Sequence, residues 1–89
     1  MAFEAVENID PRERPGAPVE ETVLGTFEVE DDAIEVARAA RERFITAGLQ
    51  DYAWWIVRVP GVTLARWIAD SSSDTEYVLD LRSGELVEY

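Results

Sequence analysis

The sequence predicts a small α+β domain in which one helix packs on a mostly antiparallel sheet. The prediction rests on one helical stripe of apolar residues over about 32–47, one strand-like segment before it and four after it. The predicted order is therefore β-α-β-β-β-β. A chain of 89 residues is the size of a single domain, and its core needs most of the large apolar side chains.

The alternation of side chains predicts the first strand, and capping residues at both ends predict the bounds of the helix. The segment Thr22–Val29 is expected to be a strand, and the helix is expected to begin with Asp32 as N-cap and Glu35 at capping-box spacing. Gly48 supplies the left-handed position that commonly ends a helix. The stripe predicted to face the sheet consists of Ala33, Val36, Ala37, Ala40, Phe44 and Ala47.

Two predicted hairpins complete the sheet. Turn residues separate their strands, which are expected at Tyr52–Val59 with Val62–Ala69, and at Thr75–Leu81 with Glu85–Tyr89. The first hairpin has no polar face, although an antiparallel sheet with one solvated side normally alternates apolar with polar residues. If Val59 pairs with Val62, Trp54 stands opposite Trp67 on one face.

Residues 1–20 are predicted to be an extended acidic tail, so that the α+β domain occupies residues 21–89. The segment contains Pro11, Pro15 and Pro18 among charged and small residues. This composition disfavours both helix and sheet.

The composition removes most catalytic chemistry. The chain has no histidine, cysteine or lysine, which excludes Ser–His and cysteine nucleophiles and the usual zinc sites. Four acids in Glu28–Asp32 offer oxygen ligands for Mg²⁺ or Ca²⁺, but acids also gather at helix N-termini because the helix dipole favours them. The spacing of Asp70, Asp74 and Asp80 selects no acid–base pair. We expect no enzyme activity, no cofactor and no metal site.

Negative charge is concentrated in the first part of the chain. Residues 1–35 hold eleven acids against two arginines, a net charge of −9 within the total of −11. This field repels phosphate, so we expect no nucleic-acid partner, although Arg58 and Arg66 are interleaved with tryptophans that can stack on bases. We also expect no membrane partner and a cytoplasmic location, because no apolar run reaches the ~20 residues of a membrane span and no secretory signal is seen.

The apolar second face of the predicted sheet carries the functional expectation. One helix covers one face, so the other needs the N-terminal tail, a second copy or another protein, unless the tryptophans simply fill a small core. We expect a non-catalytic protein-interaction module that self-associates or docks on a larger partner. The predicted partner-binding residues are Tyr52, Trp54, Ile56, Arg58 and Trp67. The alternative is an acidic DNA mimic that inhibits a nucleic-acid-binding protein.

Overall fold

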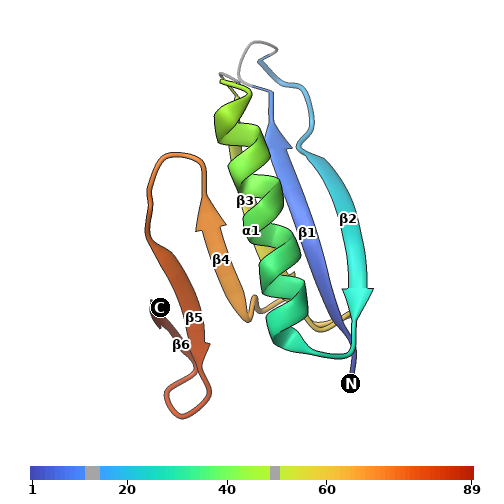
Figure 1. Ribbon diagram of the computed structural model, residues 1–89, viewed down its shortest axis with the longest axis vertical. Coiled ribbons are helices and arrows are strands. Elements are labelled where there is room, and N and C mark those ends of the chain that lie inside the picture. The colour runs from blue at the N-terminus through green and yellow to red at the C-terminus, as the bar shows by residue number, and fades with distance from the viewer. Residues whose placement is uncertain (12–14, 49–50) are drawn as a thin grey trace.

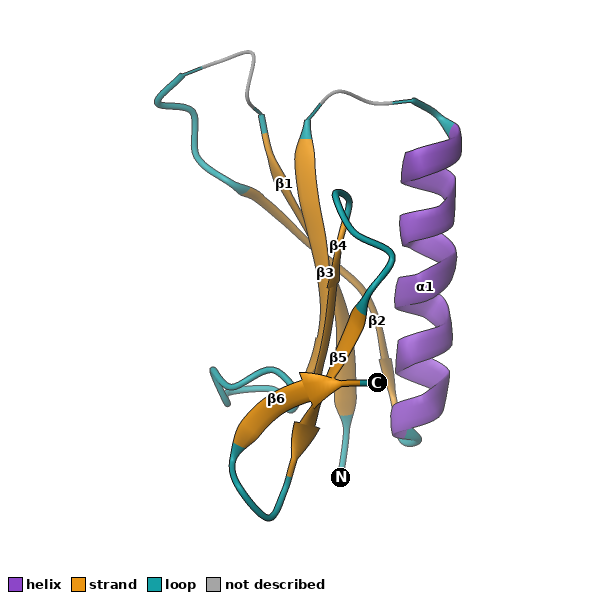
Figure 2. Cartoon of the chain, turned by 90° about the vertical axis from the view of Figure 1, so that its left-hand side faces the viewer, coloured by secondary structure: helices purple, strands orange, loops and turns teal. Residues whose placement is uncertain are grey.

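The computed structural model describes residues 1–11, 15–48 and 51–89. One helix, α1 (Glu30–Thr46), lies on one face of a six-stranded antiparallel sheet, which confirms the predicted fold class (Figures 1 and 2). The strand order across the sheet is β2-β1-β3-β4-β5-β6. The strands are β1 (Phe3–Asp10), β2 (Glu20–Phe27), β3 (Tyr52–Arg58), β4 (Trp67–Asp70), β5 (Glu76–Asp80) and β6 (Glu85–Glu88).

Strand β1 is the main departure from the sequence prediction. Residues 3–10, which were expected to belong to an extended tail, form an inner strand that pairs with both β2 and β3. Phe3, Ala5 and Ile9 alternate on the side that faces α1, and the first two are buried. This period of two favours a strand more strongly than the prolines farther along disfavour it. The tail prediction is therefore wrong for residues 3–10, and residues 12–14 lie outside the described part of the chain.

Helix α1 starts two residues earlier than predicted and is not capped by Asp32. Its N-cap is Val29, which makes no side-chain capping bond, and Asp32 stands in the first turn, where the helix dipole favours negative charge. The buried face consists of Ala33, Ile34, Ala37, Ala40 and Phe44. Val36 is only half-buried and Ala47 is exposed, so the real stripe is turned slightly toward Ile34. Gly48 has φ +67°, which confirms the left-handed position at the helix end.

Two tryptophans fill the layer between α1 and the sheet. The side chains of Trp55 and Trp67 have no solvent exposure, and Phe44 of the helix meets Trp55 edge to face at 5.5 Å. Both indole N–H groups donate to carboxylates: Trp55 to Glu7 at 3.0 Å and Trp67 to Glu76 at 2.9 Å. Because each buried indole has a hydrogen-bond acceptor, the core buries two tryptophans without an unpaired N–H group.

An ion pair ties α1 to the half of the sheet that the helix does not cover. Arg38 donates from Nε and Nη2 to the Glu76 carboxylate, with a shortest distance of 2.6 Å, and its guanidinium lies over the Tyr89 ring. The hydrogen bond from Arg38 outweighs desolvation and lowers the pKa of Glu76. The pair therefore holds β5 against the helix at neutral pH.

The first predicted hairpin has a different register in the structure. The turn forms as expected, with Val62 N–H donating to Val59 O at 2.9 Å, but the chain then runs through a loop on the side away from α1 (Figure 2). Only Trp67–Asp70 pairs with β3, and Ile56 stands opposite Ile68. This shift by an odd number of residues exchanges the two faces of β4 relative to the expectation.

Candidate functional site

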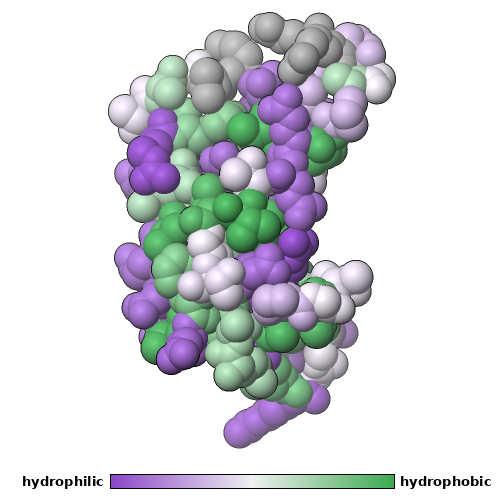
Figure 3. Space-filling view, turned by 90° about the vertical axis from the view of Figure 1, so that its right-hand side faces the viewer, coloured by the Kyte–Doolittle hydropathy of each residue, from purple (hydrophilic) through white to green (hydrophobic). Residues whose placement is uncertain are grey.

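The sheet face turned away from α1 carries a continuous cross-strand row of apolar side chains. The register pairs Val23 with Val6, Val6 with Ile56, Ile56 with Ile68, and Ile68 with Tyr77. We call these five residues the outer row. Its middle is buried or half-buried, whereas Val23 is 50% and Tyr77 is 43% exposed. In the described part of the chain no helix covers this row (Figure 2). In the space-filling view, apolar side chains gather along the middle of the β2 edge (Figure 3).

Arg58 covers the centre of the outer row on one side. It stands opposite Glu4 in the register, and its Nη2 lies 2.8 Å from Glu21 Oε1 and 3.7 Å from Glu4 Oε2. Val6 lies between Glu4 and Asn8 along the same face, and Asn8 is paired with Glu21. An arginine that reaches from the Glu4 level to Glu21 therefore passes over Val6, which explains why Val6 is fully buried without a helix above it.

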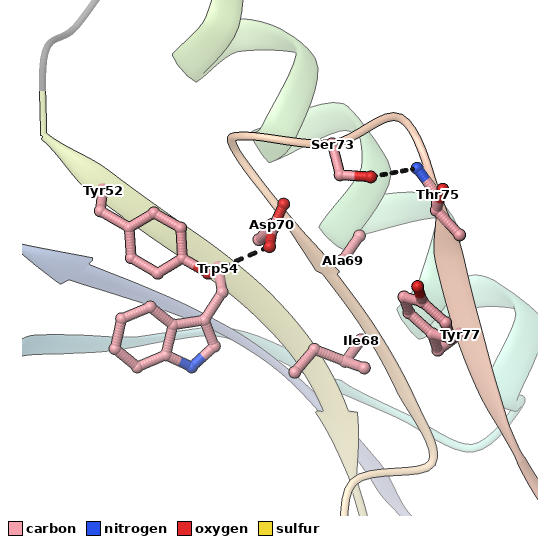
Figure 4. A pocket seen from close by; sticks show the side chains of 8 residues that line it. All are labelled: Tyr52, Trp54, Ile68, Ala69, Asp70, Ser73, Thr75 and Tyr77. Atoms are coloured by element: carbon pink, nitrogen blue, oxygen red, sulfur yellow. Dashed lines mark hydrogen bonds between the residues drawn. The ribbon is translucent and has the colours of Figure 1, made fainter. Parts of the chain in front are cut away.

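A hollow of about 390 Å³ lies on the other side of the outer row (Figure 4). Its walls include the rings of Tyr52 and Trp54 from β3 and of Tyr77 from β5, together with the Asp70 carboxylate from β4. The Tyr52 hydroxyl donates to Asp70 Oδ2 at 3.0 Å, and the Tyr52 and Trp54 rings lie 5.7 Å apart with 33° between their planes. Among the described residues, the indole N–H of Trp54 has no hydrogen-bond acceptor. The hollow is therefore an aromatic site with one carboxylate and an unused donor.

Asn8 adds a buried polar group to this face. It stands opposite Trp54 in the register and is 6% exposed. Its Nδ2 atom is buried and has no hydrogen-bond partner among the described residues. Burial of an unsatisfied donor costs about 1–3 kcal/mol of folding free energy. A hydrogen-bond acceptor that reached the Asn8 amide would recover part of this cost.

The structure brings four of the five predicted binding residues together. Tyr52, Trp54, Ile56 and Arg58 alternate on β3 and all lie on the outer face. Trp67 does not join them: it stands opposite Val57, has no exposure, and donates its indole N–H into the helix side of the sheet. The predicted Trp54–Trp67 pair is therefore wrong, because the longer loop after β3 changes the register of β4.

Sequence reasoning missed the part of the face that β1 and β5 supply. Val6 and Asn8 were assigned to the tail, although the alternation of residues 3–10 could have placed them on a strand. Tyr77 was recognised as part of a strand, but its distance from Trp54 depends on the order of the strands across the sheet. Ile68 and Asp70 reach the outer face only through the shifted register.

The acids of the chain do not form a metal centre in the part that the structure describes. No group of three or more His, Cys, Asp or Glu side chains there is arranged to hold an ion. Of the acids considered as Mg²⁺ or Ca²⁺ ligands, three lie in the first turn of α1, and Glu30 pairs with Arg66 at 3.0 Å. Helix-dipole and ion-pair interactions account for these positions.

The chain matches no protein-family model, no curated protein and no solved structure. Within the described residues, no helix has the length and the apolar composition needed to cross a membrane. We therefore interpret the outer face from its own side chains.

Proposed function

We propose that this protein is a non-catalytic interaction module that docks on a larger protein through its outer sheet face. The outer row carries the proposal, because it crosses five strands on a face that α1 leaves open. Apolar surface removed from water contributes about 25 cal/mol per Å², so a partner that covers the row gains stability. Tyr52, Trp54 and Tyr77 add aromatic side chains of the kind that dominate binding energy at interfaces.

The loop between β3 and β4 extends this surface. Val62 and Leu64 are 48% and 47% exposed, and the loop projects on the side away from α1 (Figure 2). Together with the exposed ends of the outer row, these side chains form an apolar surface that does not belong to the buried core. A large exposed apolar patch with a polar rim is typical of a protein-binding surface.

Charge favours a basic partner over a second copy of the chain. The strand positions on the outer face carry one arginine, Arg58, against five carboxylates: Glu4, Asp10, Glu21, Asp70 and Glu88. Two copies placed face to face would bring like charges together, which costs energy, whereas basic residues around an apolar ridge would complement this face. The acids stand on both sides of an apolar row, an arrangement that supports protein docking better than imitation of a continuous phosphate array.

Two valine substitutions test the proposal with matched chemistry. Val23 lies at the end of the outer row and is 50% exposed, whereas Val29 precedes α1 and is 53% exposed. Val23→Arg places a positive charge where a basic partner docks, and Val29→Arg places the same charge off the face. We expect proteins retained from native extract by the wild-type chain to be lost with Val23→Arg and kept with Val29→Arg.

Sedimentation of the purified wild-type chain completes the test. We expect a monomer at micromolar concentration, because the negative charges on the outer faces of two copies repel each other. Equal retention by the two valine variants would contradict docking through the outer row. A stable dimer of the wild-type protein would show that the partner is a second copy instead.

A further inference from the structure

We propose that the hollow formed by Tyr52, Trp54, Asp70 and Tyr77 receives a lysine or arginine side chain of the docked partner. The inference rests on the proposed function and specifies its chemistry at one site. It follows from three features of the hollow: aromatic walls, a carboxylate without a cation, and continuity with the outer row.

The aromatic walls suit a cation. Tyr52 and Trp54 project from β3 and Tyr77 projects from β5, so the rings stand on two sides of the space over Ile68 and Asp70 (Figure 4). The faces of aromatic rings attract ammonium and guanidinium groups within about 6 Å of the ring centre, and tryptophan is the strongest of them. A volume of about 390 Å³ is enough for the end of one long side chain.

Asp70 has a fixed carboxylate with no positive partner in the described part of the chain. Its Oδ2 accepts a hydrogen bond from Tyr52, and its Oδ1 accepts from the backbone N–H and hydroxyl of Ser72 at 3.1 and 3.2 Å. Arg41 approaches from the helix side but donates to the backbone carbonyl of Asp70, at 2.9 Å, and not to its carboxylate. Three neutral donors therefore hold a negative charge in place at the hollow.

Two other acids of the outer face already have a cationic partner. Glu4 and Glu21 are both neutralised by Arg58. Among the described residues that line the hollow, Asp70 is the one that carries a carboxylate, and this carboxylate remains available for an external cation. A charge-assisted contact of this kind is about twice as strong as a neutral hydrogen bond.

Continuity with the outer row identifies the source of the cation as a protein side chain. Ile68 and Tyr77 belong to the outer row and also line the hollow. A partner that covers the row therefore passes beside the hollow and can insert a long side chain without a separate binding event. A free quaternary ammonium compound shares the cation chemistry but gains nothing from the row.

The test is a titration of the ¹⁵N-labelled full chain with N-acetyl-argininamide, observed by NMR. The uncharged isostere N-acetyl-citrullinamide serves as the ligand control, and tetramethylammonium serves as the free-cation probe. We expect argininamide to shift the Trp54 indole and Tyr77 amide signals in a saturable way with a millimolar Kd, as one cation contact allows. Citrullinamide is expected to bind at least about tenfold more weakly, because it lacks the charge.

Two carboxylate substitutions complete the test. Asp70→Asn removes the cation-free charge in the hollow, whereas Asp74→Asn removes a nearby exposed charge that already lies 3.5 Å from the Arg41 guanidinium. We expect Asp70→Asn to weaken argininamide binding about tenfold and Asp74→Asn to change it little. Equal binding of argininamide and citrullinamide, or equal effects of the two substitutions, would overturn the proposal. Tight binding of tetramethylammonium without argininamide binding would assign the hollow to a free cation and overturn it as well.

Failure of this site and failure of the proposed function give different results. If only the hollow is misassigned, argininamide does not bind but Val23→Arg still abolishes partner retention. If docking through the outer row is wrong, the two valine variants behave alike whatever the titration shows.

Discussion

Trp54 and Trp55 are adjacent in sequence but lie on opposite faces, so alanine at each position tests the assignment of the faces. Trp55 has no exposure, packs against Phe44 and donates a hydrogen bond to Glu7. Removal of a buried tryptophan side chain costs about 3–5 kcal/mol, and the acceptor left on Glu7 adds to this. A domain of 89 residues has a total stability of about 4–13 kcal/mol, so Trp55→Ala removes a large part of it or unfolds the protein.

Trp54→Ala is expected to cost much less. Trp54 is only half-buried, and its ring contact with Tyr52 is worth about 0.5–1.5 kcal/mol. Its removal also lets water reach the buried amide of Asn8, which stands opposite it and has no partner among the described residues. This hydration offsets part of the loss.

Urea unfolding followed by circular dichroism measures both variants without relying on tryptophan fluorescence. We expect Trp55→Ala to lose at least about 2 kcal/mol more than Trp54→Ala, which moves the midpoint by about 1–2 M when the slope is near 1–2 kcal/mol per M. A loss from Trp54→Ala as large as that from Trp55→Ala would refute the reasoning. It would mean that the outer face is covered from within the fold.

Three further predictions concern the helix, the ion pair and a turn. Phe44→Ala removes the largest side chain on the buried face of α1 and should cost about 3–5 kcal/mol in a urea melt; a loss below about 1 kcal/mol would contradict the packing. The lowered pKa of Glu76 stabilises the fold fully above its ordinary value of 4.5, and this contribution is lost as the pH falls through the lowered value. The stability advantage of the wild-type protein over Glu76→Gln should therefore be constant near neutral pH and shrink in melts below about pH 4.5, whereas a pH-independent difference would exclude the ion pair as its cause. Gly84 has φ +73°, and a Cβ added there would meet no atom within 4 Å, so Gly84→Ala should lower stability by about 1–2 kcal/mol through conformation alone, and an unchanged melting temperature would show that the turn relaxes.

The sequence predicted the elements better than their arrangement. The helix and the last two strands lie within two residues of their predicted bounds, because helical periodicity and turn residues are local signals. Strand β1 was missed because the composition of a segment containing three prolines outweighed the alternation of residues 3–10. Pairing of β1 with both β2 and β3 is a long-range property, and no local pattern specifies it.

In the candidate site, too, the local pattern was predicted correctly and the long-range arrangement was not. The alternation of β3 placed Tyr52, Trp54, Ile56 and Arg58 on one face, and the structure keeps them together. The position of Trp67 depends on the length of the loop before it, and an odd shift in register moved it into the core. The hollow combines side chains from three strands, so it could not be recognised before the strand order was known.

Site-specific photo-crosslinking tests the central claim most directly. Tyr77 lies on the outer row and is 43% exposed, whereas Tyr89 is 63% exposed and stacks with Arg38 of the helix. A photoreactive phenylalanine at either position resembles tyrosine in shape, so the two variants differ chiefly in the face that they probe. We predict that irradiation of cells that naturally produce the protein yields one discrete crosslinked partner from position 77 and none from position 89. Crosslinks from position 89 alone, or from both positions to the same partner, would contradict docking through the outer sheet face.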